Sequence, residues 1–158
     1  MEITDLPDYI DITLSEAEAI PYPQDGEIVK AFQIRLHCFT AKQYVSTWPL
    51  RSRIMESTSK IASLFPQTAI NHQLQIDEEE AKANKTMDPQ QFKQMMLMSS
   101  FDLMAGFEDF KNLAIAGKLV ELDEGIHINR ERWDQVCGTA QEKLFFGYVA
   151  TFILPCVL

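Results

Sequence analysis

Two segments near the N-terminus alternate apolar and polar side chains with a period of two, the pattern of a half-buried β-strand. In residues 9–14, "YIDITL", one face carries Ile10, Ile12 and Leu14. In residues 28–38 the shared apolar face consists of Ile28, Phe32, Ile34, Leu36 and Cys38. A proline-rich turn, "PYPQDG", separates the two segments and ends in Asp25-Gly26, a dipeptide favoured in tight hairpin turns. The sequence therefore predicts an antiparallel β-hairpin at the N-terminus, polar on one face.

Helix start and stop signals dominate the rest of the chain. Thr40 and Gln43 have the spacing of a capping box, and Pro49 predicts a kink or restart of that helix. The segment 88–117 opens with Asp-Pro, recurs in Met and Phe, and predicts a long helix that Gly117 caps. A second capping box, Thr139 with Glu142, predicts a last helix over 140–154.

Between these helices, "KLVELDEGIHIN" predicts a short β-hairpin near residues 118–128, with Gly125 in its turn and Asn129 as the cap of a short helix. The expected fold class is mostly α (α+β): a helical domain with two β-hairpins. We expect residues 1–27 to form an acidic N-terminal arm and first strand. Residues 28–158 then make a single mainly helical domain with a polar linker at about 67–87.

Charge is distributed unevenly. The net charge is −9, and residues 1–27 hold eight acids and no Lys or Arg, whereas residues 28–60 hold six bases and Glu56 alone. The acidic arm either packs near the basic segment of its own chain or meets a basic partner. In the second case its binding residues are Asp5, Asp8, Asp11, Glu16 and Glu18. An acidic total argues against direct nucleic-acid binding.

No reactive motif stands out. The stretch 117–136 holds several carboxylates and His127, but it lacks the register of a cation-binding loop, and His127 is expected on the exposed face of its strand. The three cysteines are widely spaced and odd in number, which favours small buried side chains in a reducing compartment. We therefore expect a protein without catalytic activity, without a metal site and without a cofactor.

The Met- and Phe-rich residues of the segment 88–117 form either core or an adaptable surface that binds a protein partner. Flexible thioethers and aromatic rings accommodate varied apolar helices, and the C-terminal run over 144–158 is too short for a membrane span. The run is either core or an interface. The expected apolar contact residues are Met95, Met96, Phe101, Met104, Phe107, Phe145, Phe152 and Ile153.

The outline over about two-thirds of the chain resembles the small tail assembly chaperones of tailed bacteriophages. The resemblance rests on a strand feeding an F-T-A-x-x-Y-like helix start and on a Gly-containing hairpin before a short helix. The matching residues are Phe39, Thr40, Ala41, Tyr44, Gly125, Ile128 and Trp133. The acidic arm and the apolar C-terminus depart from that pattern. The resemblance implies a non-enzymatic protein of the host cytoplasm, or of the virion, that binds apolar segments of a tail-length-determining protein.

Three hypotheses follow. The first is an assembly chaperone of phage type that binds apolar segments of a partner protein. The second is a structural virion or complex subunit such as an adaptor, for which a homo-oligomer is a natural state. The third is an acidic inhibitor that occupies a basic nucleic-acid-binding surface, and its binding should weaken steeply with salt.

Overall fold

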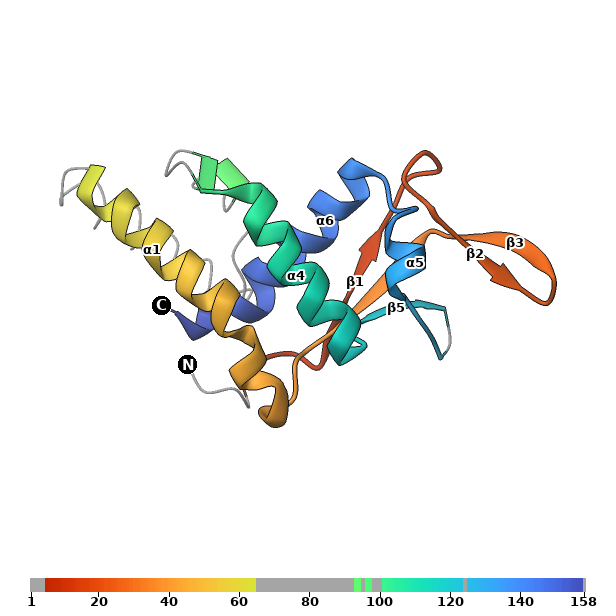
Figure 1. Ribbon diagram of the computed structural model, residues 1–158, viewed down its shortest axis with the longest axis horizontal. Helices are drawn as coiled ribbons and strands as arrows, with labels where there is room; N and C mark the ends of the chain where they lie inside the picture. The colour runs from red at the N-terminus through yellow and green to blue at the C-terminus, as the bar shows by residue number, and fades with distance from the viewer. Residues whose placement is uncertain (1–4, 65–92, 95, 98–100, 124, 158) are drawn as a thin grey trace.

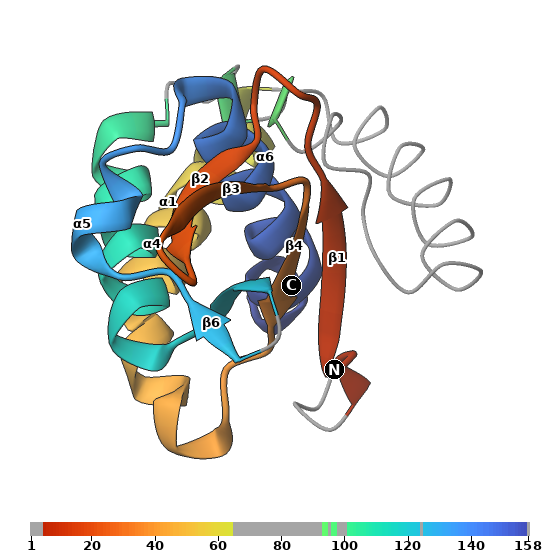
Figure 2. The ribbon, with the colours of Figure 1, turned by 90° about the vertical axis from the view of Figure 1, so that its right-hand side faces the viewer.

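The computed structural model describes residues 5–64, 93–94, 96–97, 101–123 and 125–157, with side chains left out over 58–64. It combines helices with two antiparallel sheets, so the expected α+β class is confirmed at that level. The polar linker expected at about 67–87 lies outside the described residues. The helices lie behind the larger sheet in Figure 2.

The larger sheet has four strands in the order β1-β4-β5-β6, which are Tyr9–Thr13, Gln33–His37, Val120–Asp123 and Ile126–His127. All the pairings are antiparallel. Ile34, Leu36 and Val120 are fully buried on the face toward the helices, whereas the ends of Tyr9 and Asp11 lie exposed on the other face. The alternation expected over residues 9–13 is therefore present in β1.

The smaller sheet is a hairpin of β2 (Ile20–Gln24) and β3 (Glu27–Ala31), which projects from the body in Figure 1. Asp25 and Gly26 both have positive φ, 52° and 84°, as a two-residue turn of the favoured hairpin type requires. Ile20, Tyr22 and Ala31 are buried and anchor its base.

The expected partners in the N-terminal hairpin were partly wrong. The Asp25-Gly26 turn joins β2 to β3, and the stretch expected as a proline-rich turn is itself β2. β1 pairs instead with β4, across that inserted hairpin. The strand expected over residues 28–38 is also interrupted at Phe32, which separates β3 from β4. Ile28 is therefore 70% exposed and Phe32 47% exposed, and neither shares the buried face of Ile34 and Leu36.

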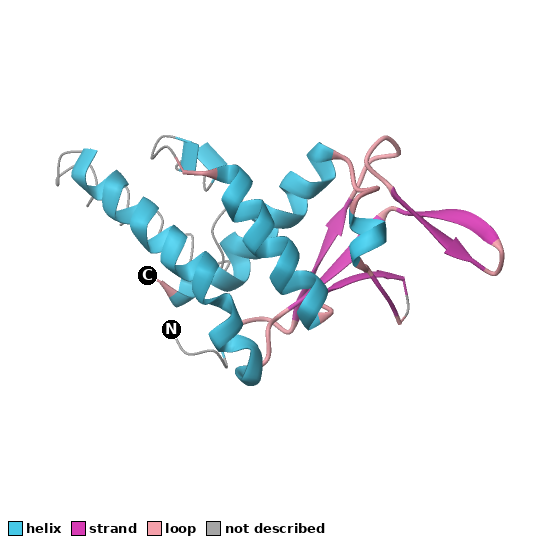
Figure 3. Ribbon diagram, in the orientation of Figure 1, coloured by secondary structure: helices cyan, strands magenta, loops and turns pink. Residues whose placement is uncertain are grey.

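The described helical elements are η2 (Ala41–Thr47), α1 (Trp48–Leu64), α4 (Leu103–Gly117), α5 (Arg130–Trp133), α6 (Gly138–Tyr148), η3 (Val149–Ile153) and η4 (Leu154–Cys156). Figure 3 shows how the helices gather at one end of the molecule and the strands at the other. η2 is a 3₁₀-helix that runs directly into α1, and Pro49 sits in the first turn of α1, where proline is well tolerated.

Local capping signals were accurate at two helices and wrong at a third. The Thr40–Gln43 capping box is formed in both directions, and the Asn129 side chain accepts a hydrogen bond from the Arg132 amide. At α6, however, the helix begins at Gly138 after Cys137, which makes no side-chain cap bond. The helix has therefore already begun when the chain reaches Thr139, so the Thr139–Glu142 capping box is not used.

The long helix expected over 88–117 is interrupted. Its first residues, 88–92, lie outside the described part of the chain. Residues 101–102 are not helical, and Asp102 caps a new helix, α4, by accepting a hydrogen bond from the Ala105 amide at 3.1 Å. At the other end Gly117 stays helical, and Lys118 takes the left-handed conformation with φ 53°. The Asp102 cap therefore starts a new helix in the middle of a segment whose apolar pattern predicts one continuous helix.

Aromatic rings from α4 and α6 form the centre of the core. Phe145 is fully buried and lies 4.8 Å from Phe107 and 6.0 Å from Phe110 between ring centroids. Tyr148 and Phe152 extend this cluster along α6 and the π-helical turn η3. Leu144 to Leu154 are buried without interruption, so the C-terminal apolar run is core in this structure.

Candidate protein-binding surface

Four residues at helical spacing form a stripe along η2 and α1: Tyr44, Trp48, Arg51 and Met55. Their spacing of four, three and four residues places them on one side of the helix. The neighbouring side carries Leu50 and Ile54, which are buried. Trp48 is 52% exposed and Met55 43% exposed. We call these four residues the aromatic–arginine stripe.

Arg51 is held at the middle of the stripe. Its guanidinium carbon lies 4.0 Å from the centre of the Tyr44 ring and 5.0 Å from the Trp48 ring, within range of cation–π attraction. Its Nε donates to Thr47 Oγ1 at 2.8 Å, and its Nη2 donates to the Tyr44 carbonyl at 3.4 Å. Thr47 is itself fixed by donating to the same carbonyl at 2.6 Å.

Within the described part of the chain, Arg51 has no carboxylate partner, and this sets it apart from four other cations. Those four each contact a carboxylate, in the pairs Arg35–Asp11, Arg53–Asp109, Lys93–Glu142 and Lys143–Glu18, over distances of 2.6–3.1 Å. Along the sequence, residues 41–55 contain three bases and no acid, and one of these bases, Arg53, is paired with Asp109 of α4. The stripe therefore combines aromatic, sulfur and basic groups, which are types enriched in protein interfaces.

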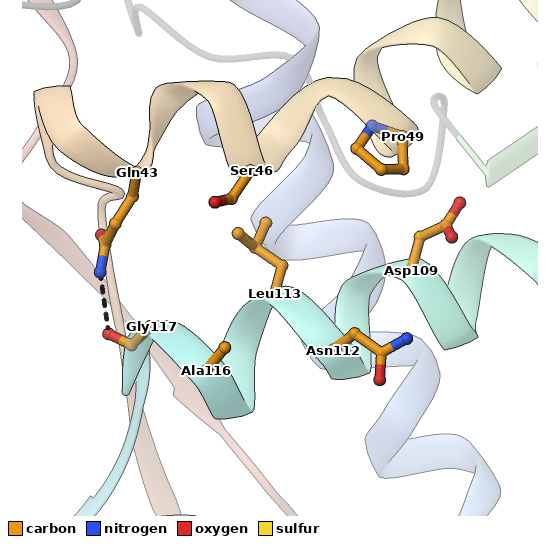
Figure 4. A pocket seen from close by; sticks show the side chains of 8 residues that line it. All are labelled: Gln43, Ser46, Pro49, Asp109, Asn112, Leu113, Ala116 and Gly117. Atoms are coloured by element: carbon orange, nitrogen blue, oxygen red, sulfur yellow. Dashed lines mark hydrogen bonds between the residues drawn. The ribbon is translucent and has the colours of Figure 1, made fainter.

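A shallow hollow of about 280 Å³ lies on the other flank of the same helix, between η2–α1 and α4 (Figure 4). Gln43, Ser46 and Pro49 line one wall, and α4 lines the other. Gln43 Nε2 closes one end by donating to the Gly117 carbonyl at 3.3 Å. The described lining contains no histidine or cysteine, so no imidazole stands beside the Ser46 hydroxyl to activate it, and the Asp109 carboxylate is paired with Arg53 at 2.8 Å.

The expected apolar contact residues separate into three groups by burial. Met96, Phe145, Phe152 and Ile153 are fully buried, so a partner cannot reach them in this conformation. Phe101 and Phe107 are half-buried, with their rings against Phe145. Met104 alone among the described members is strongly exposed, at 80%, and Met95 lies outside the described residues.

The acidic N-terminal residues do not form one continuous surface. Asp5, Asp8 and Glu16 are exposed. Asp11, in β1, contacts Arg35 of β4 at 3.0 Å, so at this point the acidic segment packs on the basic segment of its own chain. Glu18 is nearly buried, and its contacts with Lys143 and with the Ser15 amide lower its pKa to about 2.

The two described histidines, His37 and His127, lie near each other on the outer face of the sheet. His37 Nε2 lies 3.0 Å from Glu121 Oε1, and the His37 and His127 rings are 6.2 Å apart. His127 lies on this outer face, as expected from its alternation with Ile126 and Ile128, but its neighbours leave it half-buried. Its Nδ1 is buried with no hydrogen-bond partner among the described residues. Across the described residues, no group of three or more His, Cys, Asp or Glu side chains is arranged to hold a metal ion.

The three cysteines have different environments. Burial raises the pKa of Cys38 to about 11 and also raises that of Cys156. Cys137 is exposed rather than buried, and the Thr139 hydroxyl lowers its pKa. The expectation of three buried thiols is therefore wrong at Cys137 and holds only in part at Cys38 and Cys156, which are half-buried.

Sequence reasoning missed the aromatic–arginine stripe. The spacing of residues 44, 48, 51 and 55 is a signal for such a stripe. Pro49, however, predicted a break between two helices, so residues on its two sides were not expected to share one side of a continuous helix.

Among the described helices, none has the length and apolar character needed to cross a membrane. Comparison with family models, with curated proteins and with solved structures finds no match to this chain.

Proposed function

We propose that this protein is a non-enzymatic interaction protein that binds an apolar segment of a partner through the aromatic–arginine stripe. The observation that carries the proposal is the exposure of Trp48 and Met55 beside an arginine stacked on two rings. Tryptophan, tyrosine and arginine supply most of the binding energy in protein interfaces. Large side chains at one helix side are also the usual anchors of helix-in-groove and helix-to-helix recognition.

Among such proteins, an assembly chaperone of tailed-phage type is the specific role we propose. The support is the resemblance in the sequence outline, together with a binding surface that lies on a helix rather than in a catalytic cleft. A chaperone needs a surface that shields an apolar segment and later releases it. A stripe of about three helical turns is suited to that task, because a short contact dissociates more readily than a large one.

Site-specific photocrosslinking tests this proposal. A benzoylphenylalanine placed at position 48, in cells that contain the natural partners, should crosslink to an apolar segment of one protein. The same probe at Gln135, which is exposed and lies on another element, is the matched control. Mass spectrometry identifies the crosslinked segment, and the finished particle is then assayed for this chain.

Two outcomes contradict the proposal in different ways. If position 48 crosslinks no better than position 135, the stripe is not a binding surface. If position 48 crosslinks strongly but the chain stays in the finished particle in fixed ratio to its partner, the chaperone role fails. The structural-subunit reading then replaces it.

A further inference from the structure

We propose that the aromatic–arginine stripe recognises a helical segment that carries a carboxylate within its apolar side, with the carboxylate paired to Arg51. The inference rests on the proposed function and adds the chemistry of the partner. Its starting point is that Arg51 is ordered by contacts within its own chain and yet lacks a carboxylate among the described residues.

The guanidinium has donors to spare. An arginine side chain carries five N–H groups in a fixed plane, and the two hydrogen bonds to Thr47 and Tyr44 use two of them. The remaining three match the geometry of a carboxylate, which arginine binds through two parallel hydrogen bonds. Because ring stacking and the Thr47 bond already restrict Arg51, little side-chain entropy is lost when the carboxylate binds.

The flanking residues define the rest of the partner. Trp48 precedes Arg51 by about one turn and Met55 follows it by about one turn, and both are exposed. The stripe extends over twelve residues, from Tyr44 to Met55, and the steps between them correspond to roughly 16 Å at about 1.5 Å per helical residue. A helix of about three turns, with one acid at its centre and an aliphatic side chain one turn to either side, is complementary to this surface in both charge and apolar character.

Charge complementarity favours this partner over a neutral one. The nearest bases along the chain are Lys42 and Arg53, and Arg53 already contacts Asp109 at 2.8 Å. Lys42 is exposed but is not part of the stripe. Arg51 is the cation within the stripe that a partner's carboxylate would neutralise, and a lysine at the same place in the partner would be repelled.

A designed peptide probe tests the inference on the full-length protein. The probe is an amphipathic helix of about 18 residues with leucines along one side and a single Glu at the centre of that side. Two matched peptides carry Gln or Lys at the same position. Binding is measured by isothermal titration calorimetry with the wild-type protein, Arg51→Gln and the control Arg130→Gln, whose side chain is exposed on α5.

The wild-type protein should bind the Glu peptide about tenfold more tightly than the Gln peptide, the ratio that corresponds to one charge-assisted contact of about 1.4 kcal/mol. Arg51→Gln should remove that preference, and Arg130→Gln should keep it. Circular dichroism melts establish that both variants fold like the wild type.

Equal affinity of the wild-type protein for the Glu and Gln peptides overturns the inference and leaves the proposed function standing. If none of the three peptides binds, the stripe does not bind apolar helices, and the proposed function falls as well. Sedimentation of the protein alone covers one other occupant. If the chain self-associates and Arg51→Gln restores the monomer, a second copy occupies the stripe, and the inference is overturned.

Discussion

Tyr22 and Tyr148 are both buried, and their hydroxyl groups have opposite surroundings. The Tyr22 hydroxyl donates to Asp123 Oδ2 at 2.7 Å, and this bond raises the Tyr22 pKa. The Tyr148 hydroxyl is buried, and burial raises its pKa well above the usual range, an effect that the nearby Phe39 backbone only partly offsets. That approach is not a hydrogen bond of ordinary geometry, so the hydroxyl lacks such a bond among the described residues. Tyr22→Phe should therefore lower the free energy of unfolding by about 1.5 kcal/mol, while Tyr148→Phe should leave it unchanged or raise it. Urea unfolding of the two variants measures the difference. Equal losses would mean that Tyr148 has a partner in solution.

Glu18 makes the fold sensitive to acid. Its pKa in the folded protein is about 2, below the ordinary value of 4.5, so its ionised form stabilises the fold above pH 4.5, and the contribution is lost as the pH falls toward 2. The wild-type protein should be more stable than Glu18→Gln at neutral pH, and the gap should close across that window. Urea unfolding at a series of pH values measures it. Glu16→Gln, which alters an exposed carboxylate two residues away, is the matched control. A gap that stays constant down to about pH 2 would contradict the role of the Lys143 contact.

At the scale of elements, Gly106 controls how closely α4 approaches its neighbours. A Cβ atom there would lie 2.7 Å from Phe101 Cε1 and 3.1 Å from Phe145 Cζ, so Gly106→Ala should crowd the rings. We expect a net loss of about 1–2 kcal/mol, because overpacking outweighs the better helix propensity of alanine. Gly138→Ala, with nothing within 4 Å of the added atom, should be neutral or stabilising. Chemical denaturation compares the two variants, and a Gly106→Ala protein as stable as the wild type would show that Phe101 moves aside.

Most elements defined by neighbouring residues were predictable from the sequence, with the unused Thr139–Glu142 capping box as an exception, and those defined by distant residues were not. The Thr40 and Asn129 caps act over three residues and formed as expected. The pairing of β1 with β4 depends on contacts across an inserted hairpin, which no local pattern encodes. Asp102 shows the opposite error, since its capping signal was local but was hidden by the apolar residues on both sides.

At the scale of the whole molecule, the sequence alone could not separate core from surface. Phe145 and Met104 belong to the same class of large apolar residues, yet one is fully buried and the other is 80% exposed. The difference arises because α6 packs against one side of α4, and only the fold determines which side that is. The same holds for the aromatic–arginine stripe, whose exposure follows from the packing of Leu50 and Ile54 on the neighbouring side of the helix.

Phe145 and Trp48 provide the comparison that separates these two roles. Phe145→Ala removes a ring that contacts Phe107 and Phe146 at 4.8 and 5.0 Å, so it should cost about 3–5 kcal/mol, a large share of the stability of one domain. Trp48→Ala removes a half-exposed ring and should change the free energy of unfolding by less than about 1 kcal/mol. Trp48→Ala should instead weaken binding of the Glu peptide, and we expect the loss of affinity to be at least tenfold. Denaturation curves and peptide titrations on both variants test the pair. If Phe145→Ala keeps its stability and loses binding, the buried cluster opens to the partner, and the binding surface includes α6.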